Sequence, residues 1–276
     1  MTRTFWADPP WRGGRGPFRL GLTPIAESDW LPEPVDNSER LRKQDLLRNR
    51  RADVLARMDA DGGAVDAVVT FVRDRLKARG WPEMAGDEDP LAAIALAVPE
   101  DLCVMMASAR GWVLAGACLC SPSFWRLADK IGHPLDVIHA PVQGLDAVLG
   151  ERMTRFLDRL PLDRVFERVN WNVHLSRERF QPRPERWPNV LEPADCDGLH
   201  IRSERQTLRR VDAERILFSI DVRQFPLAEL ADHPRARDDL EAAIRNMTPP
   251  ERSAFGYARH GAALLEWLGQ LRAMST

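Results

Sequence analysis

One segment of the sequence gathers ionisable side chains at a spacing that could do chemistry. Residues 200–211 read His-Ile-Arg-Ser-Glu-Arg-Gln-Thr-Leu-Arg-Arg-Val, an unusual number of charges for a β-strand. Because successive side chains of a strand point to opposite faces, Arg202, Glu204 and Gln206 would share one face. An arginine there could pair with the carboxylate groups of a ligand, and Glu204 could hold a cationic ammonium group. The alternative is a solvated edge strand whose charges prevent aggregation.

Histidine is the second residue type with ligand chemistry, and the chain has six of them: His133, His139, His174, His200, His233 and His260. His139 lies between Val137-Ile138 and Ala140-Pro141-Val142, so we expect its ring to project from a rigid, partly buried loop. A neutral imidazole held there could ligate a heme iron as its single proximal ligand. The alternative is a histidine that is hydrogen-bonded in the core. His133, in a Gly-His-Pro turn, is the second choice of ligand.

Other patterns exclude several classes of protein. The sequence has none of the common nucleotide-binding, zinc-protease or serine-hydrolase motifs. With 39 basic and 41 acidic residues the net charge is −2, which gives generic nucleic-acid binding little electrostatic support. The four cysteines lack the paired spacing of zinc sites or disulfide frameworks, so they indicate buried thiols. No apolar run of about 18 residues and no signal-peptide pattern occur, so we expect a cytoplasmic protein without a membrane partner.

The elements that must position these residues follow from hydrophobic periodicity. Apolar residues at helical spacing predict helices at 38–58, 64–79, 121–131, 144–160 and in the segment after 226. Short apolar or alternating runs predict about five strands, at 103–106, 112–120, 169–175, 200–211 and 215–225. Hairpins without a regular strand–helix alternation favour an antiparallel α+β sheet. We expect one domain, with an N-terminal wrap and helices at 1–90, a core at 91–225 and C-terminal helices at 226–276.

Several phrases of the sequence occur together, in the same order, in one known family. They are Gly21-Leu22-Thr23-Pro24-Ile25, Asp29-Trp30-Leu31, Glu100-Asp101-Leu102-Cys103, Ser123-Phe124-Trp125, Lys130-Ile131-Gly132, Ile138-His139-Ala140-Pro141-Val142, Asn170-Trp171 and Glu204-Arg205-Gln206-Thr207-Leu208-Arg209-Arg210. Over roughly residues 18–225 the chain resembles the heme-dependent oxidative N-demethylases. This family includes the heme subunit of the dimethylamine monooxygenase type and was formerly a domain of unknown function.

The resemblance implies a PAS-like heme domain, with heme b as cofactor, that removes a methyl group from a small, dimethylamine-like alkylamine. Oxygen would be the oxidant, formaldehyde a product, and a separate flavin and iron–sulfur reductase the electron donor. Glu204 would position the ammonium group, with Gln206 beside it in the catalytic site. His139 would be the axial iron ligand. The cofactor contacts are expected from His139, Arg202, Arg205, Arg209 and Trp171.

The sequence departs from the family's pattern at two places. Gln143 stands where the family has a second proline, and Phe255-Gly256-Tyr257-Ala258-Arg259 only loosely matches the usual ending. Both departures could alter the choice of substrate. The alternative function is a non-catalytic PAS-like heme sensor of gas or redox state, because a fold does not fix a function. A third hypothesis is an interaction protein without a cofactor, in which residues 202–210 bind an acidic partner.

Overall fold

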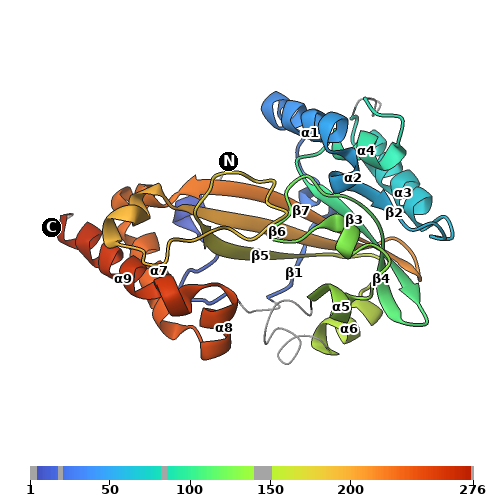
Figure 1. The fold of residues 1–276 in the computed structure, drawn as a ribbon. Coiled ribbons are helices and arrows are strands. Elements are labelled where there is room, and N and C mark those ends of the chain that lie inside the picture. Colours follow the sequence, from blue (N-terminus) through green and yellow to red (C-terminus); the bar gives the residue numbers. More distant parts are fainter. Residues whose placement is uncertain (1–4, 18–20, 82–85, 140–150, 275–276) are drawn as a thin grey trace.

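One antiparallel sheet organises the protein (Figure 1). The computed structural model describes residues 5–17, 21–81, 86–139 and 151–274. Within these ranges, seven strands lie in the order β1-β5-β6-β7-β3-β4-β2. Their bounds are β1 Thr23–Ile25, β2 Leu55–Arg57, β3 Asp101–Ser108, β4 Gly111–Cys118, β5 Val165–His174, β6 His200–Arg210 and β7 Arg215–Pro226.

The five strands expected from the sequence form the contiguous middle of this sheet, as β5, β6, β7, β3 and β4. The α+β class is therefore confirmed, whereas the count of five strands is wrong. The strands β1 and β2 extend the described sheet at its two edges, and each has only three residues. Three residues are too few to show the alternation of apolar and polar side chains by which strands are recognised.

Three groups of helices surround the sheet. Before β3 come α1 (Asn37–Asn49), α2 (Arg51–Val54), α3 (Ala64–Ala78) and α4 (Pro90–Ala95). Between β4 and β5 come α5 (Leu135–His139) and α6 (Glu151–Asp158). After β7 come α7 (Pro234–Asn246), α8 (Pro249–Ala254) and α9 (Tyr257–Met274). None of the helices in the described ranges combines the length and the apolar character that a membrane span requires.

Two of the expected helices are shorter than the sequence pattern predicts. The helix expected at 38–58 is interrupted at Arg50, and its last part becomes β2 because residues 55–57 pair with the free edge of β4. In the segment 121–131 only the single turn Leu127–Asp129 is helical. Of the helix expected at 144–160, residues 144–150 lie outside the described residues, and α6 covers Glu151–Asp158.

The two faces of the sheet carry different apolar clusters. Val165 and Leu217 pack with side chains of α3 and α4, whereas the next residues, Phe166 and Phe218, pack with Phe156 of α6 on the other face. This division follows from the alternation of side chains along a strand. We call the two sides the α3 face and the α6 face. In Figure 1, α1 to α4 lie on one side of the sheet and α5 and α6 on the other, while α7 to α9 cover the far end.

The N-terminal segment packs against the C-terminal helical region. Trp11 is fully buried, and its indole Nε1 donates a hydrogen bond of 2.8 Å to the carbonyl oxygen of Ala236 in α7. The indole Nε1 of Trp6 donates to Glu229 at 2.6 Å. These contacts join residues more than 200 positions apart in the sequence and hold the first described residues against the end of the sheet.

Candidate functional site

Polar side chains from β5 and β6 line the middle of the α6 face. In the register of the two strands, Arg168 lies opposite Gln206, Asn170 opposite Glu204, and Asn172 opposite Arg202. The residues between them, such as Val169 and Trp171, point to the other face because side chains alternate. We call the set Arg168, Asn170, Arg202, Glu204 and Gln206 the polar strip. It borders the apolar residues of β7 that share the face, among them Ile220 and Val222.

Glu204 is the centre of the polar strip. Its Oε1 accepts a hydrogen bond of 2.8 Å from Nε of Arg202, and its Oε2 accepts one of 3.0 Å from Nε2 of Gln206. The prediction that these three residues share a face is therefore confirmed. Only 13% of the Glu204 side chain is exposed. Burial alone would raise the pKa of Glu204, but the charge and hydrogen bond of Arg202 outweigh it and hold the pKa below its usual value. Glu204 is thus ionised at neutral pH.

Arg202 donates its side-chain hydrogen bonds to groups of its own chain. Besides Glu204, its guanidinium group donates to the carbonyl oxygens of Arg179 and Ser121. Only 1% of the residue is exposed. Each guanidinium nitrogen therefore has an acceptor within the chain, which leaves little capacity for a cofactor carboxylate, the role expected for Arg202 from the sequence.

Arg168 is the second cation of the polar strip, and none of the described residues is in hydrogen-bond or ion-pair distance of its guanidinium group. Its Nε is buried and makes no hydrogen bond, and the same is true of Oδ1 of Asn170. Burial lowers the pKa of Arg168, against the opposing effect of the Glu204 charge. A partly buried guanidinium group without a carboxylate partner is well suited to bind an anionic group of a ligand.

Arg168 was not among the predicted site residues because the strand was expected to begin at residue 169, whereas β5 begins at Val165. The signal was present in the sequence: Arg168, Asn170, Asn172 and His174 form one series of alternate polar residues.

The other predicted cofactor contacts on these strands lie away from the polar strip. Arg205 pairs with Glu167 at 2.5 Å, and its guanidinium group also donates to the carbonyl oxygen of Asp29. Arg209 lies 3.2 Å from a carboxylate oxygen of Glu27. Both arginines therefore hold the N-terminal segment on the α3 face.

Trp171 also points away from the α6 face. It is buried against Trp11, with 5.3 Å between the ring centroids. The structure brings Arg202, Glu204 and Gln206 together and separates them from Arg205, Arg209 and Trp171.

The predicted iron ligand stands at the end of α5. His139 is the last residue of this helix, so the expectation that it lies in a loop is wrong. Its side chain and residues 140–150 lie outside the described part of the structure. Nζ of Lys130 donates a hydrogen bond of 2.6 Å to the carbonyl oxygen of Ile138 and so fixes the end of the helix. Ile138 packs in the same apolar cluster as Phe166 and Phe218, so the end of α5 adjoins the α6 face.

His133, the second choice of ligand, is exposed in the turn before α5. Its backbone carbonyl oxygen accepts a hydrogen bond of 3.1 Å from the amide of Leu114. The described residues contain no group of three or more His, Cys, Asp or Glu side chains that could hold a metal ion by themselves.

His174 is buried beside the polar strip. Its Nδ1 lies 2.9 Å from Oε1 of Gln181, and the ring of Phe124 stacks on it at 4.9 Å. Burial, together with the charge of Arg202, lowers the pKa of His174 to about 4, so the ring is neutral at pH 7. The amide nitrogen of Gln181 donates to Glu185, which leaves the amide oxygen for His174. We therefore assign the proton to Nδ1, and Nε2 is a buried nitrogen without a partner.

A neutral buried His174 makes the stability of the protein depend on pH. The unfolded state takes up a proton near pH 6.5, whereas the folded state resists protonation until about pH 4. Stability should therefore fall as the pH falls through this window, by roughly 3 kcal/mol in all from this residue. His174→Gln should remove this component. Urea unfolding of both proteins at several pH values measures it, with the exposed His133→Gln as the control. An unchanged pH dependence in His174→Gln would contradict the assignment.

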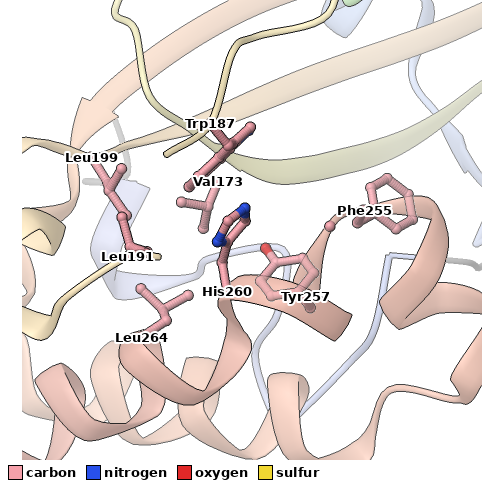
Figure 2. A pocket seen from close by; sticks show the side chains of 9 residues that line it. Val173, Trp187, Leu191, Leu199, Phe255, Tyr257, His260 and Leu264 are labelled. Carbon is pink, nitrogen blue, oxygen red and sulfur yellow. The ribbon is translucent and has the colours of Figure 1, made fainter. Parts of the chain in front are cut away.

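A hollow of about 260 Å³ lies away from the polar strip, between the end of β5, the turn after α8 and the helix α9 (Figure 2). The side chains of His260 and Tyr257 point into it, and Trp187 stacks on the His260 ring at 4.5 Å. The remaining lining is apolar, and the enclosed part has room for about one water molecule. Ligand pockets usually have about 300–1,000 Å³. We place the candidate site at the polar strip because the largely buried, charged Glu204 and the guanidinium group of Arg168 lie there.

The family of the chain follows from a match to a known protein family. Residues 41–260 match the family described as haem-dependent oxidative N-demethylase, alpha subunit-like. The chain belongs to this family. The match includes the whole of β5 and β6 and therefore every residue of the polar strip. No curated protein matches the chain.

Proposed function

We propose that the protein is a heme-binding oxidative N-demethylase that removes a methyl group from a small, dimethylamine-like alkylamine, with heme b as its cofactor. The observation that carries this proposal is Glu204, a largely buried carboxylate in its ionised form next to apolar residues of β7. A charge held in such a place is suited to a small organic cation. Membership of the family supports the heme and the oxidative chemistry.

The residues on the α6 face fit a heme group in their chemistry. Phe166, Leu208 and Phe218 offer apolar contacts for a flat ring. Arg168 is a cation without a partner among the described residues and would bind a heme propionate. His139, which directly follows Ile138 of this apolar cluster, would bind the heme iron through its imidazole. These assignments revise the sequence-based expectation, in which Arg202, Arg205 and Arg209 hold the propionates.

The residues of the chain would bind and orient the amine. When bound, the heme would supply the oxidising chemistry at the N-methyl group. Glu204 would accept hydrogen bonds from the ammonium group and so fix the direction of its methyl groups. Gln206 would hold the second oxygen of Glu204 in place. Ile220 and Val222 would exclude water from the methyl groups.

The proposed partners follow from the chemistry. Removal of one methyl group as formaldehyde consumes oxygen and two electrons, which a separate flavin and iron–sulfur reductase would deliver. The placement of α5 and α6 between β4 and β5, over the middle five strands, supports a single PAS-like heme domain.

Arg168→Gln tests the heme site of this proposal. We expect the dissociation constant for hemin to rise about tenfold, because one charge-assisted hydrogen bond to a propionate is lost. Titration of hemin into the purified protein, followed by the Soret absorbance, measures it. Arg164→Gln, an exposed arginine just before β5, is the matched control. Equal affinities of the two variants would remove Arg168 from the heme site.

Formaldehyde release tests the activity itself. The hemin-loaded protein should release formaldehyde from dimethylammonium when oxygen and a reductase or chemical electron donor are supplied. Omission of oxygen or of the donor should abolish the product. Binding of carbon monoxide or oxygen without turnover of any amine in a panel of methylamines would favour the sensor instead.

A further inference from the structure

Arg202 is the most completely bonded arginine at the site, and the residues that bond it are themselves fixed. The backbone amides of Cys120 and Ser121 donate to the carboxylate of Asp101 at 3.0 and 2.7 Å. This fixes the carbonyl oxygen of Ser121 that accepts from Arg202. The second acceptor, the carbonyl oxygen of Arg179, belongs to a residue with its own anchor.

That anchor is a buried carboxylate in α1. Glu39 is only 3% exposed, and its Oε2 lies 2.5 Å from the guanidinium group of Arg179. Arg42 donates to both oxygens of Glu39, at 2.8 and 2.6 Å, and also to Oγ of Ser121 at 2.9 Å. Arg42 thus connects Ser121, which accepts a hydrogen bond from Arg202, with Glu39, which pairs with the second acceptor residue, Arg179. The guanidinium group of Arg202 therefore has little freedom to move.

We propose that Arg202 is the positioning residue of the amine site: it fixes the carboxylate of Glu204 for an ammonium ligand and does not itself contact the ligand. This inference rests on the proposed function. It also assigns the ionic framework of Glu39, Arg42, Asp101 and Arg179 to the support of that carboxylate. An arginine that is held on three sides presents Glu204 at one angle, which a solvated ion pair would not do.

The titratable groups that face Glu204 come from two strands among the described residues. Arg202 lies on β6 itself, and Arg168 and His174 lie on β5. The neighbouring strand β7 contributes the apolar Ile220 and Val222. Arg202 is the only one of the two facing arginines that makes a hydrogen bond to Glu204 in the described structure. Removal of its charge should therefore change the protonation of Glu204 most.

The test measures the pKa of Glu204 directly. In protein with ¹³C-labelled glutamate side chains, the resonance that disappears in Glu204→Gln identifies the residue. In Arg202→Gln the pKa of Glu204 should rise by about one unit or more, and Arg202→Lys should restore part of the shift. Arg223→Gln, which removes an arginine from the α3 face of β7, should leave the pKa unchanged. An unchanged pKa in folded Arg202→Gln would overturn the proposal.

A second readout separates positioning from a structural role. The acid limb of the pH profile of kcat/KM for amine demethylation should move to higher pH in Arg202→Gln, in parallel with the pKa of Glu204. An equal loss of activity at every pH would mean that Arg202 only supports the fold and would overturn the proposal. The two failures are distinguishable, because the pKa measurement needs no turnover. If the protein demethylates no amine but the pKa rises, the proposed function fails while the bond between Arg202 and Glu204 has the predicted effect.

Discussion

Glu204→Gln should lower kcat/KM for amine demethylation by about 100-fold or more, because a buried charge partner of a cation typically contributes about 3 kcal/mol. The substitution keeps the size of the side chain and a hydrogen-bond acceptor, and it removes the negative charge. Heme content should not change, since Glu204 is not expected to contact the heme. Steady-state rates of formaldehyde release, together with the Soret absorbance of each preparation, measure both effects.

The control for this variant is Glu178→Gln, which changes an exposed glutamate in the loop after β5. It should retain the wild-type rate. The loss in Glu204→Gln should be largest for amines that are charged at the assay pH, because the lost interaction is with an ammonium group. If Glu204→Gln demethylates as fast as the wild type, the amine is held elsewhere and the polar strip is not its site.

His139→Ala should abolish the retention of heme, or weaken the binding of hemin by about 100-fold, because the axial imidazole is the expected bond between chain and iron. His133→Ala is the matched control, since it removes a histidine six positions away in the exposed turn before the same helix. It should retain the wild-type spectrum. Visible absorbance after hemin addition and gel filtration measures both variants.

Imidazole added to His139→Ala separates ligation from folding. A free imidazole can occupy the space left by the side chain and should restore a Soret band in a protein that is folded. A wild-type spectrum of His139→Ala without imidazole would exclude His139 as the ligand and leave His133 and His174. Of these two, His174 has the neutral ring and the unpartnered Nε2 that a ligand needs, but its ring is fully buried.

The five long strands were predictable because each carries either a short apolar run, as in β3 and β4, or an alternation of apolar and polar side chains, as in β5. The pairing of β6 with β5 and β7 also made it possible to predict that Arg202, Glu204 and Gln206 share a face, since the period of a strand is fixed. The edge strands were missed because a segment of three residues carries no period.

The roles of the arginines could not be predicted from β6 alone. Arg202, Arg205 and Arg209 look alike in the sequence, and what separates them is which carbonyl or carboxylate groups lie nearby. These partners come from segments more than 20 positions away, among them Arg179 and Asp29. Arg168 was not predicted because the expected strand began one residue after it, at 169. Its Nε makes no hydrogen bond among the described residues.

The visible spectrum of the protein, purified and incubated with hemin, shows whether the chain binds heme. We expect a Soret band that saturates at one heme per chain and persists through gel filtration. The band should weaken in Arg168→Gln and disappear in His139→Ala. Absence of a stable Soret band in folded wild-type protein after hemin addition would exclude a heme site on the α6 face and with it the proposed demethylase activity.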